Sequence, residues 1–265
     1  MFKFKHVFLA LGALPLATAA SATNYDLANN FGSSVFSYGS GSYANGALTF
    51  HAFSNVYSGC FNVGGFSCTT SGPAGDTSGS SNLPGIGATT NGAHFLTVDV
   101  PAGELWAHPS NAASDSDAII QFTAQEAGRY LLDGLFARLD NMTSGSNDPG
   151  NNGVSVSIFA TSGGITSLLY SSGALAGYGV TQGATATYDL AAQLGVGDVI
   201  SYVINNEGNY YNDSTGLSGS IAYAGGDNST AAVPEPASWS MMVLGFGLAG
   251  FGLRASRRRS AVTFA

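Results

Sequence analysis

Asp198-Val-Ile-Ser-Tyr-Val-Ile204 is the stretch that decides the fold class of this 265-residue chain. Successive side chains of a β-strand point to opposite faces, so Val199, Ser201 and Val203 would face one way and Ile200, Tyr202 and Ile204 the other. Both sets are largely apolar, which predicts a strand buried on both faces. Val154-Ser-Val-Ser-Ile158 instead alternates strictly between apolar and polar residues, which predicts a strand with one buried face.

Similar short runs recur along the chain between clusters of Gly, Asn, Ser and Asp. The expected strands are Ser34–Tyr38, Ala47–Phe53, His94–Val100, Ala118–Thr123, Arg129–Arg138, Val154–Ala160, Ser167–Ser171, Thr185–Leu190, Val199–Ile204 and Gly216–Ala222. No ten-residue stretch keeps a helical period, although Asp189–Gly195 is compatible with a single helical turn. Many short strands without helices predict an all-β domain, a two-sheet antiparallel β-sandwich.

The first 22 residues have the pattern of a secretory signal peptide. Lys3, Lys5 and His6 form a basic start, an apolar run follows from Val7 to Leu16, and Ala20-Ser21-Ala22 offers small residues for cleavage. This pattern predicts removal of residues 1–22 by signal peptidase, and an exported ectodomain over residues 23–232.

The last 33 residues, 233–265, combine three parts in a fixed order. Pro234, Glu235 and Pro236 form a motif, within residues 233–236, that cannot be helical. An uncharged run over 237–253, with Trp239 near its start, is about 25 Å long as a helix and predicts a transmembrane helix. Residues 254–265 form a basic tail that is expected to stay in the cytoplasm because Arg257, Arg258 and Arg259 lie there.

This order of parts resembles the PEP-CTERM sorting signal of Gram-negative bacteria, in its PEPxxWA variant. The resemblance implies that the chain is anchored transiently in the inner membrane, processed by an exosortase, and delivered to the cell surface or extracellular matrix. The alternative is an ordinary single-pass anchor. The same tail is sometimes labelled an ice-binding protein C-terminal domain, a label that describes sorting and not ice binding.

The exported part is strongly acidic. Only two basic residues, Arg129 and Arg138, lie between residues 23 and 232, together with 15 of the chain's 16 acidic residues, so the net charge there is about −13. A surface of this sign repels the phosphates of DNA and RNA, which excludes nucleic acid as a partner.

Gly59–Gly92 is rich in Gly, Ser, Thr and Asn, and we expect it to be a surface excursion from the sandwich. It contains Cys60 and Cys68, the only cysteines of the chain. A close, even pair in an exported protein predicts a disulfide. A redox or metal-binding pair is the alternative, but the spacing is not Cys-x-x-Cys and no His lies nearby.

Between Asn24 and Ala222 the chain resembles ectodomains that accompany this sorting tail and look like jelly-roll, carbohydrate-binding-module-type sandwiches. The resemblance rests on short stretches scattered along the chain: Ser37-Tyr38-Gly39, Trp106–Ser110, Ala118–Ala124, Ala127–Tyr130, Gly195–Val203 and Gly208–Leu217. It implies a jelly-roll-like sandwich and says little about the ligand.

Signatures of catalysis are missing from the sequence, so we expect no enzyme. There is no nucleophile elbow, no His-Glu-x-x-His and no Walker loop. Gly245-Phe-Gly247-Leu-Ala-Gly250 fits a dinucleotide fingerprint, but it lies in the predicted span with no strand before it. His51, His94 and His108 show no ligand spacing.

Metal and glycan contacts remain as candidate roles. Asp115, Asp117 and Asp213 occupy turn-like settings that could supply oxygens to a structural Ca²⁺, although Asp is also simply a common turn residue. Trp106, Tyr210 and Tyr211 are the candidate glycan-stacking residues, and burial in the core is the alternative for each ring.

Taken together, these features predict an exported, non-enzymatic surface or matrix protein with a role in binding exopolysaccharide. Two alternatives stay open at this point. One is an extracellular hydrolase acting on polysaccharide, which would need two carboxylates across a cleft. The other is a structural matrix protein without a ligand.

Overall fold

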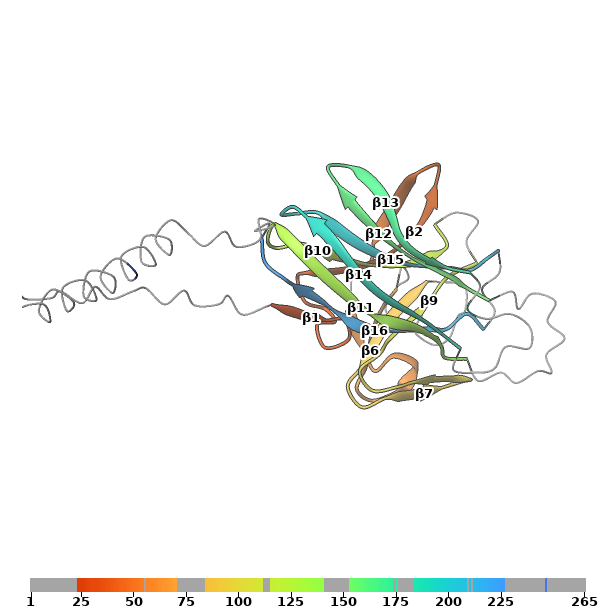
Figure 1. Ribbon diagram of the computed structural model, residues 1–265. Coiled ribbons are helices and arrows are strands. Elements are labelled where there is room, and N and C mark those ends of the chain that lie inside the picture. Colours follow the sequence, from red (N-terminus) through yellow and green to blue (C-terminus); the bar gives the residue numbers. More distant parts are fainter. Residues whose placement is uncertain are drawn as a thin grey trace, which may run out of the picture. The chain divides into compact units, whose positions relative to one another are not determined.

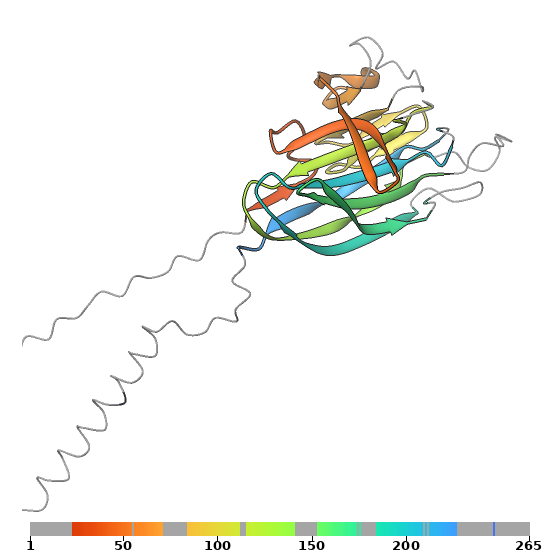
Figure 2. The ribbon, with the colours of Figure 1, turned by 90° about the horizontal axis from the view of Figure 1, so that it is seen from above.

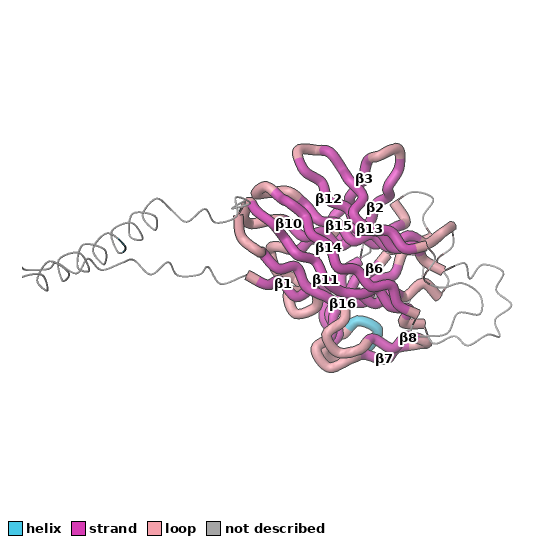
Figure 3. The backbone as a smooth tube through the Cα atoms, viewed as in Figure 1, coloured by secondary structure: helices cyan, strands magenta, loops and turns pink. Residues whose placement is uncertain are grey.

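The computed structural model describes residues 23–54, 56–70, 84–111, 115–140, 153–173, 175, 184–208, 210, 212–226 and 246. The chain divides into two compact units, Met1–Gly225 and Gly226–Ala265, and all strands with defined bounds lie in the first. In these residues the fold is all-β, as predicted, and Figure 3 marks the single 3-10 turn η1 (Cys60–Asn62) near β7 and β8.

Several predictions for the two ends of the chain fall outside the described residues. They concern the signal peptide (1–22), the sorting motif (233–236), the basic tail (254–265) and, apart from Phe246, the predicted span (237–253). None of the helices in the part of the chain that the structure describes has the length and apolar character needed to cross a membrane.

The larger sheet has eight strands (Figure 1). In spatial order they are β14 (Thr185–Leu194), β11 (Gly128–Arg138), β16 (Thr215–Tyr223), β9 (Leu105–His108), β6 (Gly85–Thr89), β5 (Phe66–Thr70) and β4 (Val56–Ser58), with β1 (Asn24–Asp26) also paired to β16. The six-stranded sheet has the order β13 (Ile165–Ser172), β12 (Ser155–Ser162), β15 (Val199–Asn205), β10 (Asp117–Thr123), β2 (Phe36–Ala44) and β3 (Ala47–Ala52).

All described strand pairs are antiparallel, including the separate pair β7 (Ala93–Phe95) and β8 (Val98–Val100). From β9 to β16 every connection except the β12–β13 hairpin crosses from one sheet to the other. In Figure 1 the strands of the six-stranded sheet lie above those of the larger sheet, and Figure 2 shows the same two layers from above. Such alternation between two layers is the pattern that the predicted jelly-roll-like sandwich requires.

The main core lies between the two sheets and follows the alternation seen in the sequence. Val154, Val156 and Ile158 are all buried in it, while the serines between them are partly exposed, as predicted. Large side chains from the opposite sheet, among them Tyr130 and Phe136, fill the space between the layers. Because both sheets contribute to one continuous cluster, each sheet needs the other to bury its apolar face.

A second, smaller core covers the outer face of the six-stranded sheet. It consists of Ile119, Phe159 and Val203, with Leu48 and Phe50 packed against them. The hairpins β2–β3 and β12–β13 project from this sheet at the top of Figure 1, and rings from each, Tyr43 and Phe159, lie 4.3 Å apart. The hairpins therefore shield the outer face, which explains why β15 is buried on both sides as the sequence predicts.

The prediction that residues 59–92 form a surface excursion is wrong for the described part of that segment. It supplies η1, β5 and β6, so two of its stretches are strands of the larger sheet. The structure contains the predicted Cys60–Cys68 disulfide, which lies in a third cluster with Phe66, Phe95 and Trp106. Residues 71–83 of the segment lie outside the described part.

The sandwich has two distinct ends. At one end the chain enters and leaves side by side, since the amide of Tyr223 donates to the carbonyl of Thr23 at 2.9 Å. At the other end, which we call the loop end, β11 finishes at Arg138 opposite Thr215, where β16 begins. The loop end is therefore the end of the sandwich remote from Gly225, where the first compact unit stops.

Candidate functional site

Among the described residues, two places are candidates for a functional site: the loop end, and a pocket at the side of the sandwich between the two sheets. The loop end is held together by local hydrogen bonds. The Asn206 side-chain amide donates to the carbonyl of Ser110 at 2.6 Å, and the amide of Leu139 donates to the carbonyl of Ser214 at 3.0 Å. These bonds gather the segments that follow β9, β11 and β15, and most of the residues singled out from the sequence lie here.

The described glycan candidates at the loop end are buried. Trp106 and Tyr210 are only 6% and 7% exposed. The indole nitrogen of Trp106 donates to the Ser214 hydroxyl at 3.2 Å, and its ring meets Phe66 edge-on. The prediction of an exposed stacking platform is therefore wrong for Trp106, because its ring completes the cluster around the disulfide. Tyr211 lies outside the described residues.

Asp213 and Asp140 form a buried acidic pair near Arg138. Asp140 accepts hydrogen bonds from the Ser214 amide at 2.6 Å and from the Thr97 hydroxyl at 3.2 Å. Both oxygens of Asp213 are buried and have no hydrogen-bond partner among the described residues. Burial is the main cause that raises the pKa of Asp213 to about 9 and that of Asp140 to about 6, while the charge of Arg138 acts in the opposite direction.

The remaining two candidates for Ca²⁺ have partners of their own. Asp117 accepts from the Asn205 side-chain amide at 2.6 Å, and burial raises its pKa to about 6. Asp115 accepts from the Thr49 hydroxyl at 3.0 Å and lies 3.4 Å from His51. Throughout the described ranges, no three His, Cys, Asp or Glu side chains come together in a group that could hold a metal ion.

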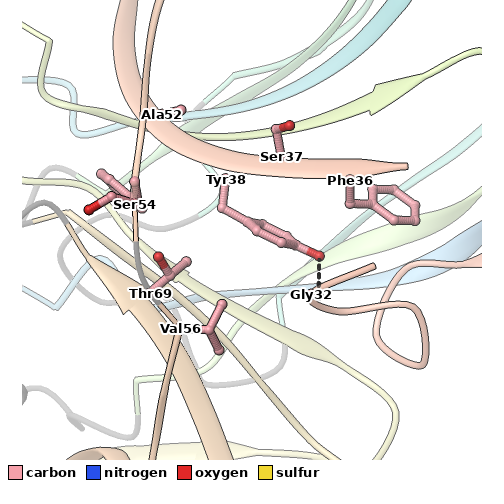
Figure 4. Close-up of a pocket in the computed structure, with 9 residues that line it drawn as sticks. Gly32, Phe36, Ser37, Tyr38, Ala52, Ser54, Val56 and Thr69 are labelled. Carbon is pink, nitrogen blue, oxygen red and sulfur yellow. Dashed lines mark hydrogen bonds between the residues drawn. The ribbon is translucent and has the colours of Figure 1, made fainter. Parts of the chain in front are cut away.

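The pocket lies at the open side of the sandwich, between β2 of the smaller sheet and β4–β5 of the larger one (Figure 4). Its volume is about 190 Å³. The described lining consists of three aromatic rings, three hydroxyl residues and three small or aliphatic residues: Phe36, Tyr38, Phe53, Ser37, Ser54, Thr69, Gly32, Ala52 and Val56. None of these residues is charged, in a domain whose net charge is about −13.

The geometry of the pocket follows from the strands that carry it. Tyr38 points from β2 toward β4 and β5, and its hydroxyl accepts a hydrogen bond from the amide of Gly32 at 3.1 Å. Desolvation raises the pKa of Tyr38 above its usual value, so the phenol stays neutral. The segment after β3 crosses from the smaller to the larger sheet here, held by a 2.8 Å bond from the Phe53 amide to the Tyr38 carbonyl. Sequence reasoning missed this pocket because its residues come from strands of different sheets.

The described part of the chain thus defines an all-β sandwich with a buried polar loop end and a small uncharged pocket at its side. Residues 232–259, which follow the sandwich, match the family model of the PEP-CTERM protein-sorting motif. The motif implies export, a membrane-anchored C-terminal sorting signal and processing by an exosortase. It covers a short part of the chain and does not assign the sandwich to a family.

Comparison with solved structures finds distant likenesses. A carbohydrate-binding module from the lichenase 5A of Cellvibrio mixtus, in complex with cellotriose, is 12% identical, with 56% of this chain and 82% of that chain covered and a TM-score of 0.22. An isomalto-dextranase of Arthrobacter globiformis T6, complexed with panose, is 11% identical, with 77% and 33% covered and a TM-score of 0.28.

The enzymatically active domain of tailspike protein 4 from bacteriophage CBA120 is 14% identical, with 69% of this chain and 21% of that chain covered and a TM-score of 0.28. The chain spans only 55% of a pentameric capsid protein from metagenomic phage sequences, 33% of the isomalto-dextranase and 21% of the tailspike domain. A search of curated proteins found no relative. At these levels of similarity the likenesses carry no argument about a ligand or an activity.

Proposed function

We propose that this chain is an exported, exosortase-processed protein of the cell surface or extracellular matrix that binds exopolysaccharide without cleaving it. The observation that carries the proposal is the PEP-CTERM motif at residues 232–259, placed after a sandwich whose last strand ends at Tyr223. The signal-peptide pattern of residues 1–22 supports entry into the export pathway. The described strands all precede the motif, so removal of the sorting segment would leave every one of them in the ectodomain.

Binding is favoured over hydrolysis by the burial of the carboxylates. A glycosidase needs two carboxyl groups that flank the scissile bond. At the loop end, Asp140 and Asp213 are only 3% and 2% exposed, so a sugar ring cannot lie between them without a rearrangement. The uncharged pocket at the side of the sandwich is open to solvent and better suited to holding a sugar than to breaking a glycosidic bond.

The charge of the ectodomain restricts the polysaccharides it can bind. A net charge of about −13 repels an acidic polymer over a Debye length of about 8 Å at physiological salt. Neutral glycans escape this repulsion, and Ca²⁺ bridging partly exposed carboxylates such as Asp115 would overcome it for acidic ones.

The test is a titration of residues 23–232, which hold every described strand, against neutral and acidic exopolysaccharides with and without a chelator. We expect chelator-insensitive binding to a neutral polymer and chelator-sensitive binding to an acidic one. Tight, chelator-insensitive binding to a polyanion would contradict the charge argument. Failure to bind any polysaccharide would favour a structural matrix protein instead.

A hydrolase is the second candidate, and one observation favours it. Asp213 and Asp140 are adjacent carboxyl groups whose pKa values lie apart, at about 9 and about 6, which is the pattern of an acid and base pair. Incubating the ectodomain with each polysaccharide and measuring new reducing ends tests this candidate. Release of reducing ends by the unmodified protein, but not by Asp140→Asn, would establish it over the binding proposal.

A further inference from the structure

The β2–β3 hairpin carries an aromatic ring that the fold supports and yet leaves open to solvent. Tyr43 is 42% exposed, whereas the other described aromatic rings of the sandwich are buried or half-buried. Its ring lies against that of Phe159 on the neighbouring hairpin, with centroids 4.3 Å apart and an angle of 37° between the planes. Phe159 is only 3% exposed, so it is a fixed support for the ring of Tyr43.

Apolar and hydroxyl side chains flank the supporting ring on the same face of the sheet. On β13, Leu168 lies directly opposite Phe159 and is 55% exposed. Thr161 and Thr166 form a facing pair two positions nearer the turn, with their hydroxyl oxygens 3.0 Å apart. Residues two apart on a strand share a face and lie about 7 Å from each other. We call this surface the hairpin platform: Tyr43, Phe159, Leu168, Thr161 and Thr166.

The hairpin platform is built from uncharged segments of an acidic domain. Neither hairpin, residues 36–52 or residues 155–172, contains Asp, Glu, Lys or Arg, although the net charge of the ectodomain is about −13. Asp115 contacts the first hairpin through the Thr49 hydroxyl. Thr49 belongs to the cross-strand pair next to that of Tyr43, so the two side chains point to opposite faces. The two hairpins offer an acidic sugar no counter-charge, and the platform therefore fits an uncharged partner.

The size and chemistry of the platform favour a sugar over a second copy of the chain. A stable dimer buries about 800 Å² on each partner around an apolar centre. Among the described residues of the two hairpins, only three large apolar side chains are exposed: Tyr43, Leu168 and Ile165. A phenol ring offers an apolar surface with a polar edge, which suits the C–H face and the hydroxyls of a pyranose. The Thr161–Thr166 pair retains one hydrogen to donate and free lone pairs to accept.

We propose that the hairpin platform holds a neutral glycan chain, with one pyranose ring stacked on Tyr43 and its hydroxyls bonded to Thr161 and Thr166. The inference rests on the proposed glycan-binding function and gives it a place and a ligand class. A contact with one ring on an open surface is weak, with a Kd on the order of 1 mM, so firm attachment needs repeated units along a polymer. Because no charged group takes part, binding should not change with salt.

The test compares variants of the exported protein with neutral gluco-, manno- and galacto-hexasaccharides as probes, by calorimetric titration at low and high salt. Tyr43→Ser removes the ring, so we expect binding of the probe that the wild type prefers to weaken about tenfold. Tyr43→Phe keeps the ring and should bind within about threefold of the wild type. Leu131→Ser is the matched control, because Leu131 is 37% exposed but lies on β11 of the larger sheet.

Hydroxyl-radical footprinting of the wild type gives a second readout that does not depend on how the variants fold. Saturating hexasaccharide should protect the peptides that contain Tyr43 and Leu168, and leave the peptide that contains Leu131 unprotected. Equal binding by Tyr43→Ser and the wild type would overturn the inference. So would a wild type that binds exopolysaccharide without protection at Tyr43, or a Tyr43→Ser variant that changes only the oligomeric state, although the proposed function would then stand. A wild type that binds no polysaccharide at all would overturn both.

Discussion

At the scale of single residues, Asp213 makes the stability of the sandwich depend on pH. The folded chain holds a proton on Asp213 up to about pH 9, whereas the unfolded chain releases it near the ordinary pKa of 3.8. Because the folded state binds the extra proton, its stability is greatest at low pH and falls as pH rises between these values. His108 acts in the opposite direction, but only below pH 6.5, since burial lowers its pKa to about 4.

We therefore predict that the thermal midpoint of the ectodomain falls between pH 6.5 and pH 9, and that Asp213→Asn reduces this fall. If ionising the buried Asp213 costs about 1 kcal/mol of stability near pH 9, the Asp213→Asn variant should unfold about 2–4 °C above the wild type at that pH. Calorimetric scans across the range measure the effect. Asp189→Asn, at an exposed position on β14, serves as the control and should leave the slope unchanged. A wild type whose midpoint does not fall would show that Asp213 is paired.

Gly39 on β2 allows a test of how closely Phe50, in the second core, packs against this strand. A Cβ at this position would lie 2.4 Å from the carbonyl oxygen of His51 and 2.6 Å from the ring of Phe50. We predict that Gly39→Ala destabilises the fold by about 1–3 kcal/mol, because backbone cannot move aside cheaply. Gly173→Ala, where a Cβ would meet nothing within 4 Å, should be neutral or slightly stabilising. Urea unfolding of both variants measures the difference, and equal stabilities would contradict the close packing of Phe50 on β2.

At the scale of elements, the strands that the sequence predicted were those with apolar alternation. Each of the ten expected runs corresponds to an observed strand, but His94–Val100 is two strands, because Leu96 adopts a positive φ of 51° that breaks the run. The single helical turn considered for Asp189–Gly195 is absent, since β14 continues to Leu194 and pairs there with Gly128. The local composition of this segment favours a helical turn, but its pairing with β11 makes it a strand.

Among the strands that the sequence missed, β6 carries two glycines whose role is packing. In β6, a Cβ at Gly85 would lie 2.9 Å from the Trp106 ring, and one at Gly87 would lie 2.7 Å from the Phe66 ring. Glycine in a strand interior marks a close approach of another group as well as a turn. The approaching rings come from β9 and β5, so the packing role of Gly85 and Gly87 could not be predicted without the fold. The same contact buries Trp106 and thereby removes it from the candidate glycan site.

The disulfide should stabilise this region of the larger sheet. Cys60 and Cys68 are 1% and 2% exposed and are separated by 8 positions. Closing so short a loop is worth about 2.5 kcal/mol in the chain-entropy model. We predict that the double variant Cys60→Ala, Cys68→Ala lowers the free energy of unfolding by at least that amount, because the alanines also lose packing against Phe66. Denaturant unfolding measures the loss, and mass spectrometry without reduction should find the two cysteines joined in the wild type.

At the scale of the whole molecule, the first and last described strands of the sandwich meet at one of its ends. The chain enters and leaves at one end, where Tyr223 is bonded to Thr23, so both predicted address segments attach there. The loop end and the side pocket are formed entirely by residues between these points. Because all described strands lie in Met1–Gly225, we expect that sorting can be disturbed without disturbing the ectodomain.

This independence gives the last prediction, which concerns sorting. Pro234, Glu235 and Pro236 lie inside the matched motif, and their rigid, non-helical backbone is the feature expected to be recognised ahead of the predicted span. Replacing all three with alanine should leave the protein uncleaved in the inner membrane, with an ectodomain that still carries its disulfide and binds glycan as the wild type does. The matched control replaces Asn228, Ser229 and Thr230 with alanine, three residues that lie outside the matched range 232–259. Membrane fractionation and the mass of the released protein measure the outcome. Normal release of the Pro-Glu-Pro variant would show that the motif is not the sorting determinant. Retention of both variants would show that the length or composition of the linker matters instead.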